Sequence, residues 1–144
     1  MRARAFFDTN VLVYAFDTRE RAKQARAWEL LQQAGRGGWG VISTQVLQEF
    51  YVIVTRKLER PLPEERAEHV LHLLAELPIV QVDTPMILSA ARLSREEKLS
   101  FWDALIIRTA TDGGCAELLS EDLQDGRTFG PLAVRNPFSR QARD

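Results

Sequence analysis

The chain has one cysteine, Cys115, among its 144 residues. It can therefore form no internal disulfide, and a lone free thiol is typical of proteins from reducing compartments. None of its apolar runs approaches the roughly 20 residues that a membrane-spanning helix needs. The residues after Met1 also lack the apolar region of a secretory signal. These absences predict a cytoplasmic protein that does not cross a membrane.

The residue patterns of several common enzyme classes are missing as well. The sequence contains no His/Cys cluster that would indicate a zinc site. It also contains no Ser-His-Asp arrangement that would indicate an acyl-transfer enzyme. The glycine-rich residues 35–38 lack the Lys-Ser/Thr pair of a P-loop and the glycine spacing of a dinucleotide fold, so we expect only a helix stop and a loop there. Charge of one sign is not in excess, with 19 basic against 20 acidic residues. This balance gives no global signal for nucleic acid but permits a local one.

What the chain does contain is an alternation of short apolar runs and amphipathic segments. This pattern is typical of a mostly parallel sheet with helices on both faces. The length suits one domain, which we expect over residues 1–138, with a polar tail at residues 139–144. Thr84, before Pro85, is expected to cap the fifth helix. We predict strands at residues 5–7, 39–42, 79–82, 117–120 and, as an edge strand, 132–135, and helices near residues 11–16, 19–34, 44–56, 64–77, 85–94 and 100–112.

Four acidic residues occupy positions from which they could converge. Asp8 and Asp122 each follow a predicted strand, and the ligand crevice of an open α/β sheet lies beyond the carboxyl ends of its strands. Glu49 borders the apolar stripe of its helix, and Asp103 is in line with one. A carboxylate near a core is costly unless it is paired or binds a cation. The four acids therefore predict a divalent-metal site that cleaves a phosphodiester, in RNA.

Three of these acids also have a purely structural interpretation. Asp8 could cap the helix that follows it. Glu49 could form a salt bridge with Arg56 or Lys57. Asp103 could be the acid of an N-terminal capping box.

Four segments resemble the acidic motifs of PIN-domain ribonucleases: Phe7-Asp8-Thr9-Asn10-Val11-Leu12, Gln48-Glu49-Phe50, Phe101-Trp102-Asp103-Ala104-Leu105-Ile106 and Leu119-Ser120-Glu121-Asp122-Leu123. The resemblance runs from the first predicted strand to Asn136-Pro137-Phe138, and the chain length resembles that of VapC-type toxins of toxin–antitoxin pairs. It implies a three-layer α/β/α PIN-like fold with a mostly parallel sheet of four to five strands.

The resemblance also implies roles for individual residues. The acids Asp8, Glu49, Asp103 and Asp122 would bind Mg²⁺ or Mn²⁺, and Asn10 and Ser120 would orient carboxylates or water. In the last motif Asp122 ranks first as the fourth acid, Asp125 second and Glu121 third.

Substrate and partner predictions follow from the same resemblance. RNA would approach through basic residues around the acids, and Trp102 could stack on an unpaired base, although solvated charge and core packing are the ordinary uses of such residues. A small antitoxin would cover the acid cleft, and the chain would form a homodimer. The alternatives are a PIN nuclease of RNA processing without an antitoxin and a non-catalytic metal-binding α/β interaction module. The basic candidates are Arg92, Arg95, Lys98, Arg108 and Arg127.

Overall fold

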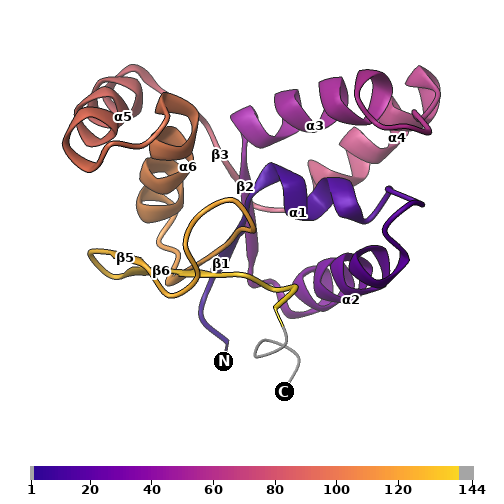
Figure 1. Cartoon of the computed structure of the whole chain (residues 1–144), viewed down its shortest axis with the longest axis horizontal. Helices are drawn as coiled ribbons and strands as arrows, with labels where there is room; N and C mark the ends of the chain where they lie inside the picture. Colours follow the sequence, from indigo (N-terminus) through magenta and orange to yellow (C-terminus); the bar gives the residue numbers. More distant parts are fainter. Residues whose placement is uncertain (1, 140–144) are drawn as a thin grey trace.

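A six-stranded sheet forms the centre of the protein in the computed structural model, which describes residues 2–139 (Figure 1). The strands lie in the order β3-β2-β1-β4-β6-β5. All neighbouring pairs are parallel except β5 and β6, which are antiparallel, so the predicted mostly parallel sheet is confirmed. The strands are β1 Ala5–Phe7, β2 Gly40–Ser43, β3 Ile79–Val80, β4 Glu117–Leu119, β5 Thr128–Phe129 and β6 Leu132–Arg135.

Helices cover both faces of this sheet, as the alternating sequence pattern predicts. Figure 1 shows α5 and α6 on one side of the central strands and α1 to α4 on the other. α6 packs against β2, β3, β4 and β6, whereas α2 and α3 contact β2. The helices of residues 2–139 are α1 Thr9–Tyr14, α2 Arg21–Gly37, α3 Thr44–Arg56, α4 Glu64–Leu74, α5 Thr84–Glu97 and α6 Phe101–Asp112.

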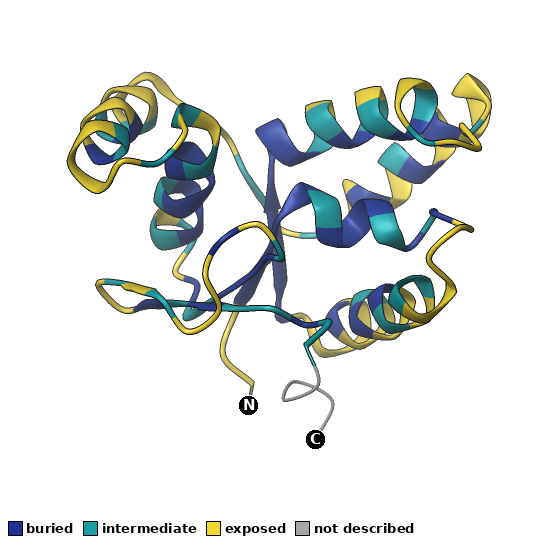
Figure 2. Cartoon of the chain, in the orientation of Figure 1, coloured by how far each residue is buried: buried dark blue, intermediate teal, exposed yellow. Residues whose placement is uncertain are grey.

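The core is centred on β1 and β2, which are the most deeply buried strands (Figure 2). Phe6 and Phe7 are fully buried, because a parallel strand with helices on both faces has no solvent side. Gly40 lets β2 approach its neighbours closely. A Cβ atom there would lie 2.8 Å from the Cβ of Ala34 in α2 and 3.1 Å from Cε2 of Phe7 in β1.

Side-chain caps fix where the helices near the predicted site begin. The Oγ of Ser43 accepts a hydrogen bond from the backbone N–H of Val46 at the start of α3. Ser100 caps α6 in the same way. The predicted cap of α5 is wrong: Asp83, not Thr84, is the N-cap residue. Thr84 already belongs to the helix, so the carboxylate of the preceding extended residue is the group that can reach the free N–H groups of the first turn.

The predicted end of the second helix and the predicted edge of the sheet are also wrong. α2 does not end at residue 34 but continues to Gly37, and Gly38 ends it with a left-handed backbone (φ 68°). Glycine adopts that conformation without steric cost, and the helix tolerates the earlier glycine of the run. Residues 132–135 are not an edge strand, because the hairpin that precedes them adds β5 outside β6. The sheet therefore has six strands and not the predicted four to five.

Two further sequence predictions concern membrane-spanning helices and the polar tail at the end of the chain. No helix within residues 2–139 is long and apolar enough to cross a bilayer. The predicted polar tail at residues 139–144 lies, apart from Ser139, outside the described residues.

Candidate active site

One small pocket at the carboxyl ends of β1 and β4 is lined by all four acids of the predicted metal site. Its volume is about 70 Å³. Since water occupies about 30 Å³ per molecule in the liquid, this is room for an ion and one or two waters. β1 and β4 are parallel neighbours, so the residues that follow them meet at one edge of the sheet. The lining residues are Asp8, Thr9, Asn10, Gln45, Glu49, Ile53, Trp102, Asp103, Ile106 and Asp122.

Asp8 is the most buried of the four acids, with 7% of its surface exposed. It caps α1, and its Oδ1 accepts from the backbone N–H of Thr9 at 2.8 Å. Its Oδ2 accepts from the Oγ of Ser120 at 2.8 Å. The pKa of Asp8 is raised to about 7, chiefly by burial and also by the charges of Asp122 and Asp103, whereas the hydrogen bonds from Ser120 and Thr9 lower it. The capping role and a place in the acid pocket therefore coexist in one residue.

Asp122 lies on the loop after β4, on the exposed side of the pocket. Its Oδ2 accepts from Nδ2 of Asn10 at 2.6 Å, and its backbone N–H donates to the Oγ of Ser120 at 3.2 Å. Partial burial raises the pKa of Asp122, the Asn10 bond lowers it, and the charge of Asp103 raises it again. Ser120 thus contacts both Asp8 and the Asp122 backbone, and Asn10 holds the Asp122 carboxylate.

Glu49 comes from the middle of α3 and has no basic partner among residues 2–139. Its Oε1 accepts from the Oγ1 of Thr9 at 2.9 Å and from Nε2 of Gln45 at 3.2 Å. The alternative of a salt bridge with Arg56 or Lys57 is wrong, because Arg56 pairs with a residue of α4 instead and Lys57 forms no ion pair with any residue in the described part of the chain. Neutral donors hold one oxygen of Glu49 and leave its charge uncompensated.

Asp103 lies in the first turn of α6. Its backbone N–H donates to the Oγ of Ser100 at 3.1 Å. The reciprocal bond of a capping box is not present, since across residues 2–139 the Asp103 carboxylate accepts no hydrogen bond. The carboxylate forms part of the pocket wall instead.

The other two acids of the last motif, Glu121 and Asp125, bind partners outside the acid pocket. Glu121 accepts from the hydroxyl of Tyr14 at 2.7 Å and forms an ion pair with Lys23 at 2.6 Å. Asp125 accepts from the backbone N–H of Asn136 at 2.9 Å. Neither residue lines the acid pocket.

Of the residues predicted to contact RNA, only Trp102 lines the pocket. None of the five Arg and Lys residues that the sequence suggested for RNA binding is among the lining residues, and Arg127 is paired with Glu97 at 3.0 Å. Core packing, the ordinary expectation for Trp102, is wrong, because its side chain is 60% exposed. Sequence reasoning missed Thr9 and Gln45, although Gln45 precedes Glu49 by four residues and so shares its helix face.

The donors around the pocket fit a hard divalent cation. They are carboxylate and amide oxygens, which Mg²⁺ and Mn²⁺ prefer, and no imidazole or thiol is present among them. Within residues 2–139, however, no three acidic, His or Cys side chains are close enough together to form a ready-made cage. Such an open arrangement suits an ion that keeps several of its waters.

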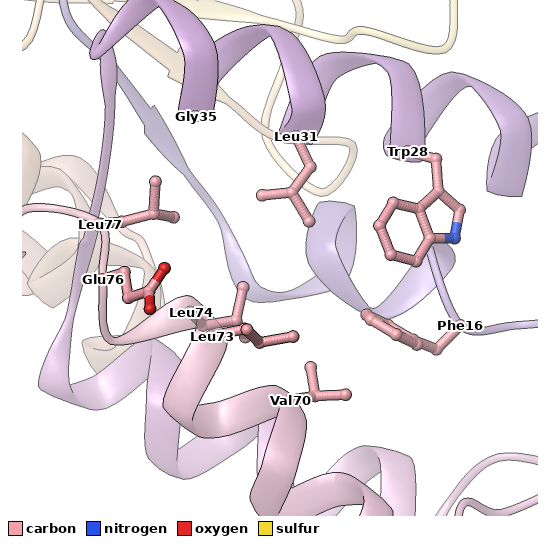
Figure 3. A pocket seen from close by; sticks show the side chains of 9 residues that line it. All are labelled: Phe16, Trp28, Leu31, Gly35, Val70, Leu73, Leu74, Glu76 and Leu77. Atoms are coloured by element: carbon pink, nitrogen blue, oxygen red, sulfur yellow. The ribbon is translucent and has the colours of Figure 1, made fainter.

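A larger apolar pocket lies between α2 and α4, apart from the acids (Figure 3). Figure 3 shows the ring of Phe16 beside the indole of Trp28, with leucine side chains along the remaining walls. The only charged residue among its lining residues is Glu76. This pocket therefore lacks the groups for metal or phosphate chemistry.

Comparison with known proteins shows the fold and the family of the chain. A toxin–antitoxin complex from Klebsiella pneumoniae has a chain of similar fold, with a TM-score of 0.66 and 23% identity over 93% of this chain and 98% of that one. VapC20 of Mycobacterium tuberculosis, a toxin that cleaves the sarcin–ricin loop, gives a TM-score of 0.62 and 18% identity over 79% of this chain and 86% of that one. No curated protein sequence matches. The family model of the PIN domain matches residues 5–124, and the chain belongs to the PIN-domain family.

Proposed function

We propose that this protein is a metal-dependent endoribonuclease that hydrolyses phosphodiester bonds in RNA. The observation that carries the proposal is the convergence of Asp8, Glu49, Asp103 and Asp122 on one pocket of ion-sized volume. These acids come from four separate segments of the chain, and carboxylates gathered in one pocket repel one another unless a cation binds among them.

All four acids would contribute to binding Mg²⁺ or Mn²⁺. When bound, such an ion neutralises phosphate charge, activates a water and stabilises the leaving oxygen. Asp8 and Asp103 are the direct ligands in our proposal, and Glu49 and Asp122 complete the site directly or through water. We propose Asp122 rather than Asp125 as the fourth acid, because only Asp122 lines the pocket.

Asn10 and Ser120 are positioning residues in this proposal. Asn10 fixes one oxygen of Asp122, and Ser120 fixes one oxygen of Asp8 and the backbone of Asp122. Asp8 must be ionised to bind a cation, and burial favours its protonated form up to about neutral pH. The Ser120 hydroxyl therefore helps Asp8 to lose its proton in the range where the enzyme would work.

In the cell we propose that the chain is the VapC-type toxin of a type II toxin–antitoxin pair. The support is its PIN-domain membership, together with folds similar to two toxin structures. It would then be a cytoplasmic homodimer silenced by a small antitoxin that covers the acid pocket.

The test is cleavage of a labelled single-stranded RNA pool with Mg²⁺, Mn²⁺ or EDTA. We expect metal-dependent cleavage by the wild type, abolished by Asp8→Asn and by Asp103→Asn while both variants still fold. Asp125→Asn is the matched control and should cleave like the wild type. Equal cleavage by all proteins, or none by the wild type with either metal, would refute the proposal. Co-expression with a neighbouring small gene tests the toxin role separately, since only an antitoxin would suppress growth arrest.

A further inference from the structure

A groove adjoins the acid pocket between α3 and the first turn of α6. Its volume is about 310 Å³, at the lower end of the range for small-molecule sites. The groove and the acid pocket share four lining residues, so a molecule in the groove would touch the acid pocket. The shared residues are Gln45, Glu49, Ile53 and Trp102, and Gln48, Val52 and Lys57 complete the groove.

The α3 wall of the groove is a single helix face, because residues 45, 48, 49, 52 and 53 are spaced by three and four. The indole of Trp102 belongs to the other wall. Its backbone is tied to α3, since the Trp102 carbonyl accepts from Nε2 of Gln45 at 3.4 Å. Its ring meets the ring of Phe101 edge to face, with centroids 5.2 Å apart. The indole is therefore held in place at one edge while most of it faces solvent.

Two apolar residues and one cation of the groove are exposed to solvent. Val52 is 48% exposed and Trp102 is 60% exposed, so adjacent apolar surface faces water. Lys57 is exposed and forms no ion pair with any of residues 2–139. An aromatic face with a free cation near it is the combination that binds unpaired nucleotides.

We propose that this groove binds the base of an unpaired nucleotide beside the scissile phosphate, with Trp102 as the stacking surface and Lys57 as a phosphate contact. The inference rests on the proposed ribonuclease function. The acid pocket itself, at about 70 Å³, has room for an ion and waters but not for a base. A nucleotide whose phosphate reaches the acids must place its base outside that pocket, and the groove is continuous with it.

The lining favours a nucleotide over an apolar peptide segment or a second copy of the chain. The exposed amide of Gln48 and the cation of Lys57 lie beside the apolar surface. These groups can hydrogen-bond a base edge and attract a phosphate, whereas a purely apolar partner would leave them without partners.

The experiment is single-turnover cleavage of a ten-nucleotide RNA in Mn²⁺, with the full chain in excess. We expect Trp102→Ala to raise the half-saturating protein concentration about tenfold, as loss of one stacked base does. The maximal rate should change little, and Trp102→Phe should retain most of the affinity. Trp28→Ala, which removes a partly exposed indole from the separate α2–α4 pocket, is the matched control and should bind RNA like the wild type.

RNAs with one abasic position test the stacking itself. One abasic position, next to the cleaved bond, should weaken binding to the wild type as much as Trp102→Ala does, and should have no further effect on that variant. Lys57→Ala should reduce the slope of log affinity against log salt by about 0.7, the value for one phosphate contact on a single strand. Arg66→Ala, which removes an exposed cation of α4, should leave that slope unchanged.

Three results would overturn the inference. An unchanged half-saturating protein concentration for Trp102→Ala would show that Trp102 is not a stacking surface, and it would leave the ribonuclease proposal intact. A loss that is equal for every abasic position would show that no single base is bound there. If light scattering showed that Trp102→Ala converts a dimer to a monomer, and if high protein concentration restored its RNA affinity, the groove would be an interface between copies of the chain. Absence of any wild-type cleavage would instead refute the underlying ribonuclease function.

Discussion

Replacement of Asp8 by asparagine should change how the stability of the metal-free protein depends on pH. Asp8 is 7% exposed and faces two other acids, so its charged form is disfavoured in the folded state. In the unfolded chain it is an ordinary solvated aspartate. An asparagine side chain has nearly the shape of a protonated aspartate and never ionises.

The direction of this pH dependence follows from the protonation of Asp8 in the folded and the unfolded chain. The pKa of Asp8 is raised from 3.8 to about 7 on folding, so between these pH values the folded protein binds a proton that the unfolded chain has lost. The free energy of unfolding therefore falls as pH rises from about 4 to about 7 and is constant beyond. The full interval from 3.8 to about 7 corresponds to about 4 kcal/mol, a large share of the 5–15 kcal/mol of a typical domain.

Urea unfolding in EDTA at pH values from 4 to 8.5 measures this effect. Subtracting the wild-type free energy of unfolding from that of Asp8→Asn cancels the other titrating groups. The difference should be near zero at pH 4 and should grow to a few kcal/mol in favour of the variant by pH 8. Asp125→Asn, an exposed acid outside the pocket, should follow the wild type throughout. A difference that does not change with pH would refute the burial argument for Asp8.

Three further changes test other parts of the structure. Ser120→Ala removes the hydroxyl that lowers the pKa of Asp8, so the midpoint of the pH–cleavage profile should move to higher pH; an unmoved midpoint would mean that the hydroxyl has no such effect. Gly40→Ala forces a methyl group into α2 and β1 and should lower the free energy of unfolding by about 1–3 kcal/mol, measured in urea. Asp122→Asn should weaken Mn²⁺ binding at least tenfold in calorimetry, whereas Asp125→Asn should not; the reverse order would make Asp125 the fourth acid.

The architecture could be predicted because the alternation of short apolar runs with amphipathic segments is strong in this chain. Strand runs such as residues 5–7 are apolar on both faces, which only a covered parallel strand requires. The edge of the sheet could not be predicted in the same way. β5 has two residues, too few for any periodicity, and it exists because a hairpin brings it beside β6.

Within the last motif, the acid that faces the pocket could be ranked but not selected from sequence. Glu121, Asp122 and Asp125 all lie on one loop after β4, where no regular period fixes the direction of a side chain. Their partners decide the outcome, and those partners come from distant segments. Lys23 of α2 holds Glu121, Asn10 of α1 holds Asp122, and the backbone after β6 holds Asp125.

Trp102 shows the same limit for a residue on a regular helix. Its neighbour Asp103 also lines the acid pocket, but successive helical side chains diverge by about 100°, so the indole and the carboxylate point in different directions. Ala104 to Ile107, in the next turn of α6, are buried, whereas Trp102 in the first turn is 60% exposed and lines the groove opposite α3. A large aromatic residue is therefore exposed where the general preference for burial predicts core packing. Because the departure from that preference occurs beside a proposed metal ligand, it is better explained by a bound base than by chance.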